Sequence, residues 1–349
     1  MQWGAAMTVI VLFGGSSDER QVSVATGQNV ARTLDRPMCW FWAPNGAVHD
    51  VRVGDLLEHQ RPFELDFKPT RPARWPTFGA ALDALEIDDP VFLLALHGGE
   101  GEDGTVQRLL EERNLPFTGS GSKASAAAFD KGRAKEMVKG RVKVAESRII
   151  APGEREALQE AIADLLGRHE RIVLKPLAAG SSRGLFFLDR GGRVDEVVES
   201  IVQLDLPYIL EQFIRGRELT VGVADLENGP VPLPVVEIEV EPGHAFDYEG
   251  KYLGKGTREI CPAKIDDTVA RAAQQTALAA HMALGCEGYS RTDIMAADDG
   301  PYFLETNTLP GLTTSSLVPQ ELKAAGLDFK RFLERQIDLA RKRVSAAAG

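Results

Sequence analysis

The stretch SRTDIMAADDGPYFLETNTLPG, residues 290–311, has the pattern of a β-hairpin and decides the fold of the C-terminal part of the chain. Two largely apolar segments, 290–296 and 301–307, flank the turn residues Asp-Asp-Gly at 298–300. A three-residue loop that ends in glycine is a common connection between antiparallel strands. The sequence therefore predicts two paired strands that end where Pro310-Gly311 breaks the chain direction.

Polar side chains gather on one face of this predicted hairpin. If the residues that flank the turn lie opposite each other, Asp293 pairs with Glu305 and Arg291 pairs with Asn307. Successive side chains on a strand alternate between faces, so Glu305 and Asn307 point the same way and Phe303 shares their row. A slip of one residue, which a β-bulge would cause, would dismantle this pairing.

The chemistry of these side chains fits a metal that works with phosphate. Carboxylate and amide oxygens suit Mg²⁺, which leaves room in its coordination shell for substrate phosphates. A neighbouring arginine suits the charge that develops when phosphate is transferred. We therefore predict a metal site made of Asp293, Glu305 and Asn307, with Arg291 beside it. The alternative, which is the better explanation for any one residue taken alone, is a solvated polar strand face.

Composition bounds the class of protein. The chain has 349 residues, 44% of them hydrophobic and 26% charged, which is ordinary for a water-soluble protein of two or three domains. The formal net charge of −11 and the lack of a long Lys/Arg run disfavour nucleic acid as a partner. No apolar run approaches 18 residues, so no membrane span is expected. Three scattered cysteines fit a reducing cytoplasm and do not form a zinc motif.

The first third of the chain alternates predicted strands and helices, which is typical of an open, mostly parallel α/β sheet. The expected elements are a strand at 8–13, helices at 23–34 and 78–85, a strand at 91–96, a helix at 105–113 and a short strand at 115–118, with a proline-rich connector at about 35–77. Ligands of such sheets lie at the carboxyl ends of the strands. Two polar loops, 14–20 and 97–104, leave those ends, and neither has the GxGxxG spacing of a dinucleotide site.

The rest of the chain changes to strands and hairpins between two long helices. The predicted elements are a helix at 125–138, strands at 172–175, 185–188, 208–213, 219–224 and 235–240, and a final helix at 329–344. Apolar residues recur in that last helix at a spacing close to 3.6 and are expected to be buried: Phe329, Phe332, Leu333, Ile337, Ala340 and Val344.

Three further stretches carry candidate binding residues. VLKPLAAGSSRGLFF, residues 173–187, joins two strands through a small-residue loop that could form an anion-binding nest over phosphates, with Lys175 just before it. The segment 208–223 puts Glu211 near the end of one strand and Glu218 at the start of the next. The segment 246–263 has the length and irregularity of a lid, with Lys251 and Tyr252 as its candidate side chains. Taken alone, the loop at 178–184 is equally well explained by an ordinary hairpin turn, and Glu211 and Glu218 are better explained as two edge carboxylates. Lys131, within a helical stretch, is better explained as a solvated lysine.

Taken together, these stretches resemble the D-alanine–D-alanine ligases of the ATP-grasp superfamily. The motifs that carry the resemblance run in family order from Thr8 to about Arg341: LFGGSSDERQVSV, ALHGGEGEDGTVQ, FTGSGSKASAAAFDK, VLKPLAAGSSRG, FDYEGKYL and GYSRTDIM…FLETNTLPGLTTSSLVP. The resemblance implies an α/β (α+β) ATP-grasp fold with a Rossmann-like N-terminal substrate domain, residues 1–120. A small central domain with the phosphate flap would follow at 121–217, and a mixed α+β domain with lid and metal site at 218–349.

The resemblance also implies an activity and its place in the cell. The protein would join two D-alanines with ATP, through an acylphosphate, to supply the dipeptide for peptidoglycan and so for the cell wall and cell shape. It would be a cytoplasmic homodimer that uses two Mg²⁺ ions, with Mn²⁺ as a substitute.

The resemblance assigns a role to each candidate residue. Glu19 would bind the ammonium of the first D-alanine with His97 nearby, and Ser316 and Leu317 would receive the second D-alanine. Arg291 and the N–H of Gly311 would stabilise the oxyanion, and Ser181 and Tyr252 would link the lid to Glu19. The remaining residues would bind ATP or metal: Lys131, Lys175, Gly180, Ser181, Ser182, Gly184, Glu211, Glu218 and Lys251 for ATP, and Asp293, Glu305 and Asn307 for the two metal ions.

Several alternatives stay open at this point. Tyr252 favours an amine over D-lactate as second substrate, while D-serine and a role in secondary metabolism remain compatible with the sequence. Another ATP-dependent carboxylate–amine ligase would keep the ATP and metal residues but not the matches at Glu19, Tyr252 and Ser316. A regulator without catalysis would be expected to lack Arg291, Asp293 or Asn307, and all three are present. An NAD-dependent oxidoreductase would need the absent glycine fingerprint.

Overall fold

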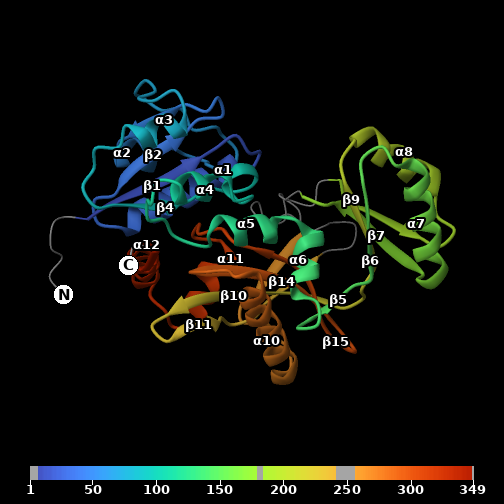
Figure 1. The fold of residues 1–349 in the computed structure, drawn as a ribbon. Coiled ribbons are helices and arrows are strands. Elements are labelled where there is room, and N and C mark those ends of the chain that lie inside the picture. The colour runs from blue at the N-terminus through green and yellow to red at the C-terminus, as the bar shows by residue number, and fades with distance from the viewer. Residues whose placement is uncertain (1–6, 179–183, 241–255, 348–349) are drawn as a thin grey trace.

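The computed structural model describes residues 7–178, 184–240 and 256–347. Within these ranges the strands form three sheets, of four, seven and four strands. Figure 1 shows the N-terminal sheet at the upper left, the four-stranded central sheet at the right, and the seven-stranded sheet between and below them. This mixed α/β arrangement is the predicted fold class.

The N-terminal sheet has the order β3-β2-β1-β4, with β1 parallel to both β2 and β4. Its elements are β1 (Thr8–Gly14), α1 (Arg20–Thr33), β2 (Met38–Trp42), β3 (Val48–Val51), α2 (Val53–Glu58), α3 (Phe78–Asp83), β4 (Pro90–Leu94), the short helix η1 (Gly99–Gly101) and α4 (Thr105–Glu111). The apolar run of β1 is buried on both faces, as expected for a central parallel strand.

Two details of this region differ from the prediction. The expected connector at 35–77 contains β2, β3 and α2, and the aromatic run of β2 packs beside β1. The expected strand at 115–118 makes only an isolated bridge, between Phe92 and Phe117. At the end of β1, Gly14 has φ +102°, and a Cβ there would lie 2.3 Å from the carbonyl oxygen of Trp42, so only glycine fits.

The seven-stranded sheet runs β13-β12-β10-β14-β15-β5, with β11 paired to β10. Its strands are β5 (Lys143–Val144), β10 (Arg217–Leu226), β11 (Gly229–Pro232), β12 (Val236–Val240), β13 (Thr257–Ile260), β14 (Tyr289–Ala297) and β15 (Gly300–Asn307). Helix α10 (Asp267–Leu284) covers one face through alanines that allow close packing against Leu219, Val221 and Ile294.

The β14–β15 hairpin has the predicted residue pairs far from its turn, but the register close to the turn differs from the prediction. Asp293 lies opposite Glu305 and Arg291 opposite Asn307, as predicted. At the turn, however, Ala297 pairs with Gly300 rather than with Pro301, which leaves a two-residue loop. The register shifts between Asp293 and Ile294, where Leu304 is the extra residue of a β-bulge.

The same bulge overturns the prediction for Phe303. Phe303 pairs with Ile294 and is fully buried against Ala280 and Leu284 of α10. Because adjacent residues on β14 alternate, Ile294 and Phe303 share the α10 face, while Asp293 and Glu305 share the other one. The bulge therefore separates an apolar half of the hairpin from a polar half.

The central sheet has the order β6-β9-β7-β8 and is antiparallel in the pairs β6–β9, β7–β9 and β7–β8. Its elements are β6 (Ser147–Ile150), α7 (Arg155–Arg168), β7 (Arg171–Pro176), β8 (Phe186–Asp189), α8 (Val194–Leu204) and β9 (Tyr208–Gln212). Helices α7 and α8 cover one face through a core that includes Leu165, Ile172, Val198 and Leu210.

The predicted helix at 125–138 is two helices, α5 (Ser122–Phe129) and α6 (Lys131–Val138). Asp130 separates them, and its side chain accepts a hydrogen bond from the Arg133 N–H, which caps α6. Ala134 and Val138 of α6 pack with α10 and β15 rather than with the central sheet. We therefore propose that the central domain begins near residue 146, and not at residue 121.

The C-terminal helices join the large sheet to the N-terminal domain. Helix α11 (Leu317–Ala324) follows the loop after β15, and α12 (Phe329–Ala347) lies against the N-terminal domain near β4 (Figure 1). Four of the residues predicted to be buried in α12 are buried, namely Phe332, Leu333, Ile337 and Ala340, while Phe329 and Val344 are half-buried. In the described parts of the chain, no helix combines the length and the apolar character that a membrane span requires.

Candidate active site

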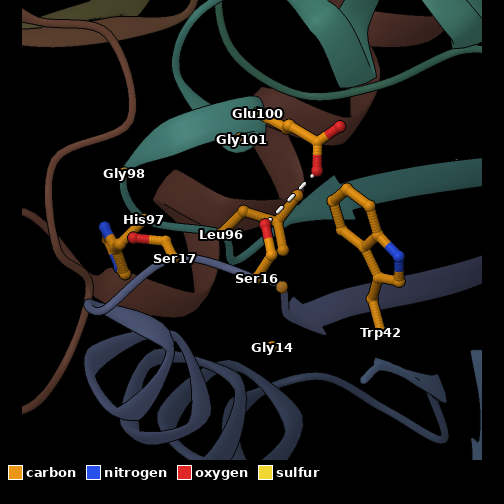
Figure 2. Close-up of a pocket in the computed structure, with 10 residues that line it drawn as sticks. Gly14, Ser16, Ser17, Trp42, Leu96, His97, Gly98, Glu100 and Gly101 are labelled. Carbon is orange, nitrogen blue, oxygen red and sulfur yellow. Dashed lines mark hydrogen bonds between the residues drawn. The ribbon is translucent and has the colours of Figure 1, made fainter. Parts of the chain in front are cut away.

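The first part of the site is a small pocket at the carboxyl ends of β1 and β4, where the two predicted polar loops meet. Figure 2 shows Ser16 and Ser17 of one loop facing His97, Gly98 and Glu100 of the other. The hydroxyl of Ser16 donates to Glu100 at 3.3 Å. The pocket is lined by Gly14, Gly15, Ser16, Ser17, Trp42, Leu96, His97, Gly98, Glu100 and Gly101. The parallel sheet therefore places its polar loops as the sequence predicts.

Glu19 lies directly before α1 and reaches this pocket's edge. Its N–H donates to the Ser17 hydroxyl at 3.0 Å. A Cβ on Gly98 would lie 2.8 Å from the Glu19 carboxylate and 2.4 Å from the Ser17 hydroxyl oxygen, so both side chains touch the backbone of the His97 loop. The ammonium-binding role that the resemblance implies for Glu19 stays a prediction.

His97 connects the pocket to the loop that follows β15. Its side chain is buried, its Nε2 lies 2.9 Å from the Thr26 hydroxyl, and its Nδ1 lies 3.8 Å from Glu102. A Cβ on Gly311 would lie 4.0 Å from His97 and 2.6 Å from the Ser316 hydroxyl oxygen. The structure thus brings His97, Gly311 and Ser316 together from distant parts of the sequence.

Leu317 is more deeply buried than its neighbour Ser316. Its side chain is buried against Val236 and Ile238 below the loop. A contact between Leu317 and a substrate would therefore come from its main chain, whereas the Ser316 side chain is half-buried and hydrogen-bonds the Thr313 N–H and hydroxyl.

The second part of the site is the polar half of the β14–β15 hairpin. The Arg291 guanidinium binds Asp293 through two hydrogen bonds of 3.0 Å, and both side chains are about nine-tenths buried. Thr220, opposite Asp293 on β10, donates its hydroxyl to the same carboxylate at 2.6 Å. Asp293 is therefore held in one orientation, with a cation at its side.

The residues on the neighbouring strand complete this polar face. Glu305 lies opposite Asp293, and its carboxylate is 3.1 Å from the Lys131 ammonium at the start of α6. Asn307 accepts a hydrogen bond from the Leu309 N–H through its amide oxygen. No three His, Cys, Asp or Glu side chains of the described residues cluster as a metal site. Two carboxylates and an amide oxygen on one face nevertheless fit a Mg²⁺ ion that takes its remaining ligands from substrate phosphates.

The third part is a basic cluster, defined here as Lys131, Lys135 and Lys175, where α6 meets β7. The carboxylate of Glu211 on β9 lies 2.7 Å from the Lys135 ammonium and 2.8 Å from that of Lys175. Burial opposes the charge of Lys175, but the carboxylates of Glu211, Glu305 and Asp293 outweigh it and raise the pKa of Lys175. The pKa of Glu211 is lowered because Lys175 and Lys135 outweigh the effect of its burial.

The other residues predicted to bind ATP lie on β9, on β10, at the edge of a described range, or outside the described ranges. Glu218 is the second residue of β10, opposite Met295, and the Glu211 carboxylate is engaged by the two lysines. Gly184 has φ +69° and its carbonyl accepts a hydrogen bond from Tyr208. The predicted residues Gly180, Ser181, Ser182, Lys251 and Tyr252 lie outside the described parts of the chain.

Three residues near the site were missed by the sequence reasoning. Thr220 and Lys135 are described above; Lys135 follows Lys131 by four residues on a helix, a spacing that places both on one face and could have been noticed. Glu321 of α11 is fully buried and accepts a 2.6 Å hydrogen bond from the Gly222 N–H, opposite Arg291 on β14. Burial raises the pKa of Glu321 to about 8.

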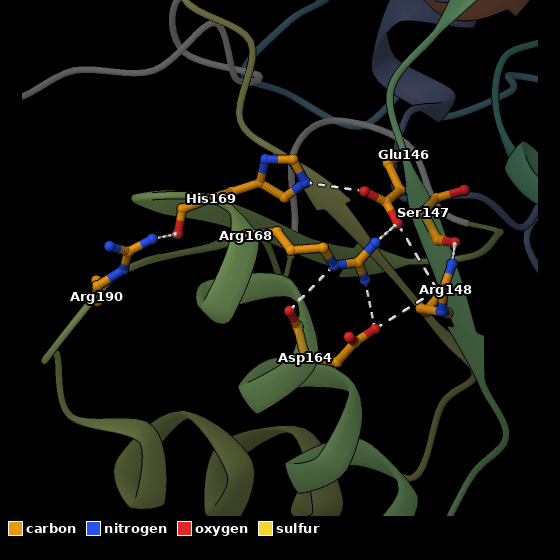
Figure 3. Close-up of polar contacts among 7 residues, drawn as sticks. All are labelled: Glu146, Ser147, Arg148, Asp164, Arg168, His169 and Arg190. Atoms are coloured by element: carbon orange, nitrogen blue, oxygen red, sulfur yellow. Dashed lines mark hydrogen bonds and ion pairs between the residues drawn. The ribbon is translucent and has the colours of Figure 1, made fainter.

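A separate charged cluster lies in the central domain (Figure 3). Glu146, at the connection between β5 and β6, binds the imidazole of His169 at 3.0 Å and the guanidinium of Arg168. Arg168 also binds Asp164 one helical turn earlier. Hydrogen bonding to His169 lowers the pKa of Glu146, with Arg168 acting in the same direction. The cluster fastens the entry into the central sheet to the end of α7 and contains none of the predicted site residues.

The three sheets, with a basic cluster facing an acidic hairpin, are the arrangement of an ATP-grasp enzyme, and the comparisons with known proteins agree with this class. A family model described as D-ala D-ala ligase N-terminus matches residues 8–120, and one described as D-ala D-ala ligase C-terminus matches residues 151–338. The chain belongs to the D-alanine–D-alanine ligase family.

Individual relatives agree with this membership. The chain is 36% identical over 337 residues to the D-alanine–D-alanine ligase of Syntrophobacter fumaroxidans, covering 96% of this chain and 97% of that one. The VanG D-Ala:D-Ser ligase from Enterococcus faecalis has a TM-score of 0.79 at 27% identity, covering 96% and 99%. The D-alanine–D-alanine ligase from Bacillus anthracis complexed with ATP has a TM-score of 0.72 at 27% identity, covering 98% and 100%.

Proposed function

We propose that this protein joins two molecules of D-alanine into D-alanyl-D-alanine with ATP, the dipeptide used in peptidoglycan synthesis. The observation that carries the proposal is that carboxylates and lysine ammonium groups face each other across one site. Asp293 and Glu305 lie side by side on β14 and β15, and Lys131 and Lys175 approach them from α6 and β7. A nucleotide triphosphate with its metal ions needs both kinds of partner.

The first D-alanine is assigned to the pocket between the N-terminal loops. Glu19 binds its ammonium group, and His97 lies at the same end of the site. The carboxylate of the first D-alanine would then point toward the loop after β15, where Gly311 lies beside His97 and Ser316. Ser316 and the main chain of Leu317 would receive the second D-alanine.

ATP is assigned to the space between the central sheet and the large sheet. Lys131 and Lys175 bind its phosphates, Gly184 borders the flap, and the segment around Glu211 and Glu218 takes the adenosine. Gly180, Ser181, Ser182, Lys251 and Tyr252 would act from the flap and the lid.

Two Mg²⁺ ions, or Mn²⁺ in their place, would be held by Asp293, Glu305 and Asn307. When bound, they neutralise the negative charge on the transferred phosphate. Arg291 lies beside Asp293 and is held by it in a fixed orientation, so its guanidinium is ready to stabilise negative charge without reorganising.

The proposed reaction has two steps. A carboxylate oxygen of the first D-alanine attacks the γ-phosphorus, and ADP leaves, which gives an acylphosphate. The amino nitrogen of the second D-alanine attacks the acyl carbon, and the bond from that carbon to the phosphate oxygen breaks. The phosphate leaves with the oxygen that came from the carboxylate of the first D-alanine and with the proton lost by the nitrogen, as hydrogenphosphate. Arg291 and the Gly311 N–H stabilise the oxyanion, and the enzyme acts mainly by positioning.

The identity of the second substrate needs its own test, because the similar VanG protein is by its title a D-Ala:D-Ser ligase. The assay is ADP release by the purified protein with MgATP and D-alanine, D-alanine plus D-serine, D-alanine plus D-lactate, or L-alanine, with products identified by mass. ADP release with D-alanine alone and a D-Ala-D-Ala product is the expected result. Turnover only with another acid and amine would keep the ligase chemistry and reject the proposed substrate. A homodimer in the cytoplasm is the assembly and location that we propose with this function.

A further inference from the structure

Lys135 is a buried charge that the roles above do not use. It lies one helical turn after Lys131 on α6, with 5% of its side chain exposed, compared with 10% for Lys131 and 15% for Lys175. Its ammonium is 2.7 Å from one oxygen of Glu211, and the Lys175 ammonium is 2.8 Å from the other oxygen. Two lysines therefore share one buried carboxylate.

The sharing has an electrostatic consequence for Lys175. A carboxylate paired with one ammonium at this depth forms a neutral pair, because the interaction of two charges is strong where water is excluded. A second ammonium on the same carboxylate leaves one net positive charge on the group of Lys135, Lys175 and Glu211. Glu211, which is 4% exposed at its side chain, has no comparable third partner among the residues that the structure describes.

The position of Lys135 argues against a direct role in binding ligand. It is the most deeply buried member of the basic cluster, and its ammonium points to Glu211, which lies on β9 beside Lys175 of β7. Burial lowers the pKa of Lys135, while Glu211 acts in the opposite direction, so its charge depends on that carboxylate. Lys131 lies 3.1 Å from Glu305, and the charges of Glu305 and Asp293 act on Lys175, so these two members of the basic cluster are the ones next to the polar hairpin.

We propose that Lys135 is a positioning residue for ATP binding: it shares the Glu211 carboxylate, so that the Lys175 ammonium keeps a net positive charge for the phosphates. The inference rests on the proposed function, in which Lys175 binds phosphate. Without Lys135, Glu211 would pair with Lys175 alone and compete with the phosphates for it.

The test is equilibrium binding of ATP and of adenosine, without D-alanine, to wild type and Lys135→Met. ATP is expected to bind about tenfold more weakly, the loss of one charge-assisted contact, while adenosine affinity is unchanged. Lys139→Met, at the exposed residue that directly follows α6, is the matched control and should bind both ligands as wild type does. An unchanged ATP affinity in Lys135→Met would overturn the proposal.

The double variant Lys135→Met/Glu211→Gln separates charge sharing from packing. It is compared with Glu211→Gln alone, because Glu211 lies in the segment assigned to adenosine. If Lys135 acts through the Glu211 carboxylate, adding Lys135→Met to Glu211→Gln should change ATP affinity by less than about threefold. A further loss of about tenfold on adding Lys135→Met to Glu211→Gln would overturn the proposal, since Lys135 would then act on phosphate directly or only through packing.

Lys175→Met distinguishes this inference from the function on which it rests. Weak ATP binding in Lys175→Met with normal binding in Lys135→Met would reject the inference alone. Normal ATP binding in Lys175→Met would reject the phosphate role of Lys175, and the inference with it.

Discussion

Glu321→Gln should make the protein more stable at alkaline pH and change little at acid pH. The Glu321 carboxyl is fully buried on α11, and burial raises its pKa to about 8, from an ordinary value of 4.5. Its Oε1 accepts the Gly222 N–H, and its Oε2 has no hydrogen-bond partner within the described ranges. Glutamine keeps an oxygen for Gly222 and carries no titrating proton.

The direction of the pH dependence follows from which state, folded or unfolded, holds the Glu321 proton. Between pH 4.5 and about 8 the folded state keeps the Glu321 proton and the unfolded chain has released it, so raising the pH favours unfolding. The slope approaches about 1.4 kcal/mol per pH unit, and the full window corresponds to about 5 kcal/mol as an upper bound. Above the folded pKa the effect levels off.

The assay is urea unfolding of wild type and Glu321→Gln at pH 5.5, 7.0 and 8.5. The free energy of unfolding of the variant minus that of wild type should rise with pH, because the other titrating groups cancel in the difference. Glu160→Gln, at an exposed position of α7, is the control for the same chemical change at the protein surface. A pH-independent difference for Glu321→Gln would refute a neutral buried carboxyl.

Other expected outcomes concern the same region and the polar hairpin. Gly222→Ala places a Cβ 2.5 Å from the Glu321 carboxylate and should lower the free energy of unfolding by about 1–3 kcal/mol. The same substitution should cost less in a protein that also carries Glu321→Ala, and an equal cost in the two backgrounds would contradict this contact. Glu305→Ala should abolish ADP release while the circular dichroism spectrum is unchanged, and normal turnover would reject its metal role. Thr220→Val removes the hydroxyl that holds Asp293 and should raise the Mg²⁺ concentration for half-maximal activity severalfold, as measured by Mg²⁺ titration of ADP release.

The sequence is sufficient where one local pattern determines the outcome. The apolar run of β1 and the period of α12 predict a buried strand and a buried helix face, and both are found. The pairing of Asp293 with Glu305 was predicted correctly from a wrong turn, because the shorter loop and the bulge at Leu304 compensate each other. The face of Phe303 could not be predicted, since a bulge depends on packing against α10 rather than on spacing.

Contacts between distant segments explain what else was missed. The Lys135–Glu211 pair and the hydrogen bond from Gly222 to Glu321 join residues separated by 76 and 99 positions. No periodicity in a single sequence marks such partners. The break between α5 and α6 was recognisable, because Asp130 is a favoured N-cap residue. The strands within 38–51 were also recognisable from the aromatic run of β2, but prolines nearby suggested a connector.

The central claim is that the charged residues of the site transfer the γ-phosphoryl group to the carboxylate of D-alanine. It is tested most directly with D-alanine labelled with ¹⁸O in its carboxylate, by mass analysis of the phosphate released with MgATP. The attacking oxygen leaves with the phosphate, so one ¹⁸O atom per phosphate is expected for each dipeptide formed. Unlabelled phosphate would show that ATP is cleaved without an acylphosphate, and would contradict the account.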